Sequence, residues 1–471
     1  MEATTATSAP RAGLWSALGE ALRGSHRDFT TESIPRSIFL LAVPMVLELV
    51  LESVFAVVDV FAVNRVGPDA VATVGLTESM LVLVYAVAMG VGIGAMALVA
   101  RRIGEKDPER AARTAVQAVV LALLLAVPVV VAGIGLAPRL LRFMGASPWV
   151  LAHGVQYTRV MMASTVSITL LFLINSIFRG AGDAAVAMRV LWLANGLNIV
   201  LAPSLVLGLG PFPRLGVVGA ALGTTLGRTA GVLYQLWRLS RPGGRIRVER
   251  RHLHIEWATI RQVLQLSGSA TVQVLVGMAS WIGIVRIIAG FGSAAVAGYT
   301  IGIRIVLFAL LPSVGLANAA ATLVGQNLGA RQPDRAARSA WLAAGFNTGF
   351  LGVVGLGLLA FAPGLIHLFD PEPEVAGYGV SCLRVISVGF CFYGLGMVMT
   401  QALNGAGDTR TPTLINFGCF WVLELPLAWT LAHPAGLGPR GAFLAILVAF
   451  CTVAVAGTLV FRAGRWKLRF L

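Results

Sequence analysis

The chain has 471 residues, of which 57% are hydrophobic and only 12% are charged, about half the charged share of a typical soluble protein. Apolar runs long enough to cross a bilayer recur along most of the chain, so the composition excludes a soluble globular protein and predicts an all-α, polytopic membrane protein. The net charge of +15 does not indicate nucleic-acid binding, because the basic residues lie in short loops between apolar segments.

The predicted elements begin after an N-terminal tail, residues 1–35, which lacks the apolar core of a signal peptide. We predict twelve membrane-spanning helices, at residues 36–63, 71–100, 111–136, 152–178, 186–208, 216–240, 258–290, 296–326, 336–361, 377–403, 411–432 and 440–463.

The first predicted span, "VPMVLELVLESVFAVVDVFAV", carries the acids Glu48, Glu52 and Asp59. A helix turns by roughly 100° per residue, so all three acids fall on one face. A carboxylate at the bilayer centre costs about 2.5–3.5 kcal/mol, so this face is expected to line a cleft and not to contact lipid. Pro44 lies one turn before the acids and predicts a bend in the helix.

The alternative to a functional role is that these acids form structural ion pairs with arginines inside other spans. The candidate partners are Arg159, Arg228, Arg286, Arg304 and Arg384.

Further polar residues occur in later spans. Glu78 follows in the second span and Glu424, next to a proline, in the eleventh. Asn175 lies near the end of the fourth span, and Asn195 and Asn198 share one face of the fifth. Buried amides need hydrogen-bond partners, so these asparagines are predicted either to line the cleft or to join helices to one another.

The loops predict the orientation. The segments 100–113, 238–254 and 329–339 and the C-terminal tail are rich in arginine and fall on one side of a twelve-span topology. The opposite loops contain few basic residues. The positive-inside rule therefore places both termini in the cytoplasm, and we expect a multi-pass protein of the plasma membrane.

An internal repeat organises the chain. "LVARRIGEKDPERAARTA" (98–115) matches "LVGQNLGARQPDRAARSA" (323–340), and "GAGD" recurs at 180–183 and 405–408, both at an offset of 225 residues. Six spans per repeat give both halves the same orientation, so we predict two six-helix lobes related by a pseudo-two-fold axis. The predicted regions are a tail (1–35), an N-lobe (36–240), a cytoplasmic linker (241–257), a C-lobe (258–463) and a C-terminal tail (464–471).

The acids are not part of the repeat. At the same offset Glu48, Glu52, Asp59 and Glu78 stand opposite Gln273, Gly277, Ile284 and Ile303, and Glu424 stands opposite Ile199. The acids are therefore not needed to build a lobe, which indicates a function specific to one lobe.

The repeat, the segment "VVDVFAVNRVGPDAVATVG", the loops "FRGAGD" and "LNGAGDTRTP", and "GVVGAALGTT" together resemble the multidrug and toxic compound extrusion (MATE) transporters, over residues 35–460 and closest to the prokaryotic DinF-like and NorM-like branches. The resemblance implies export of organic cations in exchange for H⁺ or Na⁺. It also implies that Asp59 is the coupling acid, that Asn198 lies beside it, and that Pro44 marks the bend of the first helix.

The sequence departs from the family pattern at two places. The second acid expected after Asn198 is replaced by Ala202, and the seventh and tenth spans carry no acid. We therefore predict that Glu52, together with Asp59 and Asn198, forms the cation-coupling site, with Na⁺ held at Asp59 and Asn198 if Na⁺ is the coupling ion. The predicted substrate cleft contains Glu48, Asn175, Asn195, Glu78 and Glu424.

The predicted function is secondary active export of cationic, amphipathic organic compounds by antiport, with alternating access between the lobes. We expect no cofactor, H⁺ over Na⁺ as the coupling ion, small organic cations and the bilayer as partners, and a monomer. One alternative is a flippase for lipid-linked precursors, which would need basic residues in the cleft. The other is a membrane enzyme, for which the loop histidines form no motif.

Overall fold

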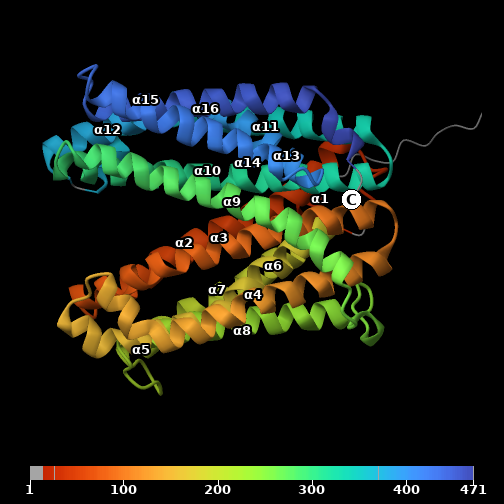
Figure 1. Cartoon of the computed structure of the whole chain (residues 1–471), viewed down its shortest axis with the longest axis horizontal. Helices are drawn as coiled ribbons and strands as arrows, with labels where there is room; N and C mark the ends of the chain where they lie inside the picture. The colour runs from red at the N-terminus through yellow and green to blue at the C-terminus, as the bar shows by residue number, and fades with distance from the viewer. Residues whose placement is uncertain (1–13, 26, 370, 470–471) are drawn as a thin grey trace, which may run out of the picture.

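The computed structural model describes residues 14–25, 27–369 and 371–469, and only the backbone of residues 14, 56–62 and 64. The described part is built of helices (Figure 1). The helices of the first half are α1 (Leu14–Arg23), α2 (Ile34–Asn64), α3 (Pro68–Gly104), α4 (Pro108–Phe143), α5 (Val155–Ala163), α6 (Thr165–Ala181), α7 (Ala184–Leu207) and α8 (Val217–Ser240).

The second half repeats this order with its own helices. They are α9 (Trp257–Ala289), α10 (Ser293–Gly329), α11 (Pro333–His367), α12 (Pro373–Val388), α13 (Phe390–Gly405), α14 (Arg410–Asn416), α15 (Leu425–Ala432) and α16 (Pro439–Arg462). Short π-helical segments, Val150–Gly154 and Phe417–Glu424, precede α5 and join α14 to α15, and 3₁₀ turns occur at Arg250–His252 and Arg465–Leu468.

Ten helical segments in the described part are long and apolar enough to cross a membrane, and the pair α12 and α13, bent by 56°, makes an eleventh. The remaining long helix, α8, has 24 residues but carries Thr224, Arg228 and Gln235, which lower its hydropathy. Together these segments account for the twelve predicted spans, and the predicted all-α fold is confirmed.

The backbone confirms the internal repeat. Residues 68–104 of α3 correspond at an offset of 225 to residues 293–329, the bounds of α10. Lys106 and Arg331 share this offset, and both adopt a left-handed conformation (φ 58° and 57°), which is uncommon for non-glycine residues. Gly182 and Gly407 share it as well (φ 84° and 82°) and end equivalent helices.

The two halves meet at the end of the molecule that carries the C-terminus and α1, and they diverge toward the opposite end (Figure 1). At the meeting end Thr322 Oγ1 donates to the carbonyl of Arg179 (3.1 Å), and Gln326 Nε2 donates to the carbonyl of Gly180 (2.9 Å). Gly104 lies so close to the carbonyl of Gln326 that a Cβ atom there would collide with it. The seam between the lobes, where α3 and α6 meet α10, therefore depends on small residues.

The first turns of α2 and α9 pack in the opposite half of the molecule. Ile38, Leu41 and Met45 of α2 belong to one buried cluster with side chains of α10, α11 and α13. Ile260 and Val263 of α9 belong to a cluster with α3, α4 and α6. This reciprocal exchange ties the lobes together while leaving the later turns of both helices in their own lobes.

Pro44 lies inside α2, and the helix runs through it without interruption. A proline removes one backbone hydrogen bond, which makes this point easier to bend. The bend that the sequence predicts at Pro44 stays a prediction.

Candidate functional site

The centre of the candidate site is Glu48 on α2, whose side chain is only 2% exposed. Asn175 Nδ2 donates to Glu48 Oε1 (3.3 Å), and Arg179 Nη2 lies 3.6 Å from the same oxygen. Both partners come from α6, one turn apart, so one helix supplies an amide and a positive charge to the same carboxylate. The other oxygen, Oε2, is buried and has no hydrogen-bond partner among the described residues.

The amide of Asn175 is fixed by a second helix. Gln235 on α8 donates its Nε2 both to Asn175 Oδ1 (2.8 Å) and to the carbonyl of Leu171 (3.0 Å). With its oxygen accepting from Gln235, Asn175 must turn its NH₂ toward Glu48. The chain Gln235–Asn175–Glu48 thus joins α8, α6 and α2 through buried polar groups.

Glu52, one turn after Glu48, is half-buried and has a partner of its own. Asn195 on α7 donates its Nδ2 to Glu52 Oε2 at 2.8 Å. Two acids on one face of α2 are therefore held by amides of two different helices, α6 and α7. The structure thus brings Asn175 and Asn195 together with Glu48 and Glu52, and their predicted place in a substrate cleft stays a prediction.

Asn198 lies one turn after Asn195 on α7 but faces a different partner. Its Nδ2 donates to Thr224 Oγ1 of α8 (2.8 Å), and its Oδ1 is buried and accepts no hydrogen bond from the side chains and backbone that the structure describes. The side chain of Asp59 lies outside the described residues, so its predicted pairing with Asn198 stays a prediction.

In the described part of the chain no three His, Cys, Asp or Glu side chains form a group that could hold a metal ion.

Glu78 and Glu424 lie apart from this cluster. Glu78 on α3 is exposed, and its carboxylate interacts electrostatically with Arg228 of α8, which also donates to Tyr85 Oη (3.0 Å). Glu424 ends the π-helical segment Phe417–Glu424 in the C-lobe, is 6% exposed, and accepts a hydrogen bond from Ser280 Oγ (3.3 Å). The structure therefore gives each lobe its own buried glutamate.

Sequence reasoning missed two central residues, Arg179 and Gln235. Arg179 was not among the arginines considered as partners, because it lies at the very end of its span. Both residues differ from their repeat equivalents, Asn404 and Val460. The comparison of the two halves singled out the acids because they differ from their repeat equivalents. Arg179 and Gln235 differ in the same way, so the same comparison could have identified them.

The family model described as MatE matches this chain over residues 44–204 and 269–430, one match in each half. These matches cover more than half of the sequence and place one copy of the conserved pattern in each lobe. The chain therefore belongs to the MatE family, which makes it a transporter and not an enzyme.

Relatives with known names match over nearly the full chain. A protein of Thermotoga maritima named "Probable multidrug resistance protein NorM" is 25% identical over 443 residues, which is 93% of this chain and 94% of that protein. A protein of Shewanella oneidensis named "FAD transporter" is 25% identical over 405 residues, which is 85% of this chain and 88% of that protein. A crystal structure of a MATE protein in complex with MaL6 superposes with a TM-score of 0.86 at 27% identity, covering 92% of this chain and 97% of that one.

Proposed function

We propose that this protein exports organic cations across the plasma membrane in exchange for protons, with the acids of α2 binding both. The observation that carries the proposal is the pair Glu48 and Glu52, two carboxylates one turn apart in the N-lobe, held by amides of α6 and α7. A relative named as a multidrug resistance protein supports the substrate class.

The chemistry follows from the partners of each acid. Glu48 has one oxygen without a donor, and a buried ionised carboxylate with an unpartnered oxygen is costly. Glu48 shares its charge with Arg179, whereas Glu52 forms no ion pair with the described residues, so a proton on Glu52 removes its charge and an organic cation beside it balances that charge. Each therefore occupies the site when the other has left, which is the requirement for antiport. Na⁺ is the alternative coupling ion, because carboxylate and amide oxygens suit it as well.

Alternating access would arise from rocking of the two lobes about the seam that the small residues form. In the described structure the lobes meet at the end that carries the C-terminus. The arginine-rich loops lie at this end, and the positive-inside rule supports a cytoplasmic position for it. We infer that the structure represents the outward-facing state of the cycle, in which Glu52 is half-exposed and Glu48 is buried.

The competing proposal is a carrier of anionic lipids or nucleotides. The charged residues of the N-lobe fit this proposal less well than they fit cation export. An anion carrier needs positive charge that is not already neutralised. Arg179 is the nearest base to Glu48, and its guanidinium is directed at that carboxylate. The relative named as an FAD transporter makes FAD a necessary comparison in any transport assay.

The test uses proteoliposomes with the full-length protein in one orientation. Efflux of ethidium is measured under an imposed pH gradient, then under an imposed Na⁺ gradient, for wild type, Glu48→Gln, Glu52→Gln and Asp59→Asn. Asp334→Asn, a change at an exposed acid of α11, is the matched control.

We expect the pH gradient to drive ethidium export in wild type and in the control, and export to fall at least tenfold in Glu52→Gln or Asp59→Asn. Gradient-driven transport of FAD but not of ethidium would contradict the proposal. Full coupled export by all three acid variants would also contradict it.

A further inference from the structure

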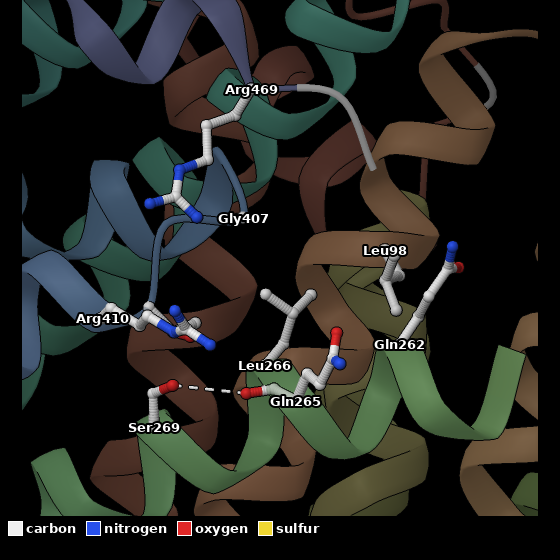
Figure 2. A pocket seen from close by; sticks show the side chains of 9 residues that line it. Leu98, Gln262, Gln265, Leu266, Ser269, Gly407, Arg410 and Arg469 are labelled. Atoms are coloured by element: carbon white, nitrogen blue, oxygen red, sulfur yellow. Dashed lines mark hydrogen bonds between the residues drawn. The ribbon is translucent and has the colours of Figure 1, made fainter. Parts of the chain in front are cut away.

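A polar cavity of about 320 Å³ lies on the seam between the lobes, away from the acids of α2 (Figure 2). Its walls are the first turns of α9, the loop 407–410 that leads into α14, and the C-terminal tail after α16. Leu98 of α3 closes it from the other lobe. The cavity lies at the end of the molecule where the basic loops gather.

The internal repeat shows that this cavity is specific to the C-lobe. The equivalent loop in the N-lobe, residues 182–185, is covered by the N-terminal segment, with Gly182 against the ring of Phe29 and Gly24 against Ala185. In the C-lobe the loop lines the cavity instead, and Arg410 stands where the N-lobe copy has Ala185. One copy of the pocket is thus filled by the chain itself, and the other is open and basic.

The side chains around the cavity have unused donors. Arg410 is exposed and forms no hydrogen bond or ion pair with the described residues. The hydroxyl of Thr409 is buried, with the residue 1% exposed, and has no hydrogen-bond partner in the described part of the chain. Gln265 of α9 lies between Leu266 and Gln262 with its amide in the space that Arg410 and Arg469 border, whereas the amide of Gln262 lies beyond Leu98, on the side away from Arg410 (Figure 2).

The charge of the cavity is that of a weak anion site. None of the lining residues is acidic. Arg469 also forms an ion pair with Asp408, at 2.9 Å, just behind the wall. The charges of Arg410, Arg469 and Asp408 sum to +1, which matches the single negative charge of a phosphodiester. Guanidinium groups bind phosphate oxygens through paired hydrogen bonds, and hydroxyl and amide donors complete such a site.

We propose that this cavity binds a phosphate group, and that the phosphodiester of an anionic phospholipid headgroup is its main source. The apolar side chains Leu98 and Leu266 border the same space and suit the first carbons of the acyl chains of such a lipid. The site lies outside the acid cluster and does not depend on which substrate the protein exports.

The site is assembled from both lobes. Arg101 of α3 donates to the carbonyl of Arg469 (3.0 Å), so the tail that supplies Arg469 is also held by the N-lobe. Separation of the lobes at this end would remove Leu98 and this anchor together. A ligand bound here therefore favours the state in which the lobes meet, by as much as its affinity differs between the two states.

The experiment uses the full-length protein in nanodiscs of phosphatidylcholine and follows binding of a fluorescent, short-chain phosphatidylglycerol. The variants are Arg410→Gln and Thr409→Val, with Arg338→Gln on α11, another exposed arginine, as the matched control. Thermal unfolding of each variant shows that it is folded.

Arg410→Gln is expected to weaken phosphatidylglycerol binding about tenfold, the effect of losing one charged hydrogen-bond pair, and the control is expected to leave it unchanged. Competition by millimolar inorganic phosphate would identify soluble phosphate as the source, and absence of competition would identify the lipid. Equal binding by wild type, Arg410→Gln and Thr409→Val would overturn the proposal.

Discussion

The carboxylate of Glu48 has two kinds of partner, and they imply different roles. Arg179 at 3.6 Å makes it half of a buried ion pair, whereas the amide of Asn175 and the unpartnered Oε2 make it a group that can take up a proton. Removing one member of a buried ion pair typically costs 3–5 kcal/mol, because the other charge is left without compensation. A double variant separates the two roles.

We predict that Arg179→Gln lowers the thermal stability of the protein and that Glu48→Gln/Arg179→Gln restores most of it, because the second change removes the stranded charge. Coupled export is expected to stay low in the double variant. Unfolding temperature and ethidium export measured on the same preparations check both parts. If the double variant recovers full coupled export as well as stability, Glu48 is a structural partner only.

The relay behind Glu48 allows a second prediction at the scale of single residues. Gln235→Leu removes two hydrogen bonds and leaves Asn175 Oδ1 without its donor in a buried place. We expect a loss of about 1–3 kcal/mol in stability and weaker export. Ser79→Ala, an exposed change on α3, serves as the control, and an unchanged unfolding temperature for Gln235→Leu would contradict the relay.

At the scale of elements, the sequence predicted more than it missed. The order of the spans, the repeat and the acid face of α2 all follow from periodicity and from a direct comparison of the halves. The break between α12 and α13 and the π-helical segment before Glu424 were not predicted, because both depend on how a turn packs and not on its hydropathy. Arg179 was missed because a long side chain at a helix end can reach back along the helix.

The close packing of α3 against α10 allows a prediction at the scale of elements. A Cβ atom at Gly104 would collide with the carbonyl of Gln326, whereas Gly135 on α4 has nothing within 4 Å of that position. We predict that Gly104→Ala slows export and lowers the unfolding temperature, while Gly135→Ala changes neither beyond the gain expected from alanine in a helix. Equal behaviour of the two variants would rule out tight closure of the lobes at Gly104.

At the scale of the whole molecule, the N-terminal segment (residues 14–36) links the two halves at the end where they meet. Arg27 pairs with both Glu20 (2.5 Å) and Glu32 (2.7 Å), and Arg36 pairs with Glu20 (2.7 Å). Arg335 of α11 donates to the carbonyl of Glu32. The segment therefore links α1, α2 and the C-lobe through charges that respond to pH.

These carboxylates predict a loss of stability in acid. Partial burial raises the pKa of Glu20, but the hydrogen bonds from Arg27 and Arg36 outweigh it, so its pKa lies below its ordinary value. The pKa of Glu32 is also lowered: burial opposes the shift, while hydrogen bonds from the Ser33 backbone and Arg27 outweigh that effect. A lowered folded-state pKa adds stability above the unfolded value, about 4.3, and this stability disappears as pH falls through the folded value.

We therefore expect Glu20→Gln/Glu32→Gln to unfold at a lower temperature than wild type at pH 7. The free energy of unfolding should fall by no more than about 1 kcal/mol, because these ion pairs are partly exposed. The difference should shrink below about pH 4, where wild type also loses these charges. Unfolding curves of both proteins from pH 3 to pH 7 measure it. A difference that stays constant over this range would contradict an electrostatic role for the segment.

The central claim is that a proton and an organic cation compete for the acids of α2. The most direct test is the heat of ethidium binding to the purified protein at one pH in two buffers of different ionisation enthalpy, which gives the number of protons released. We predict a release of about one proton per ethidium in wild type and much less in Glu48→Gln/Glu52→Gln. Binding without proton release, or the same release from both proteins, would contradict the account.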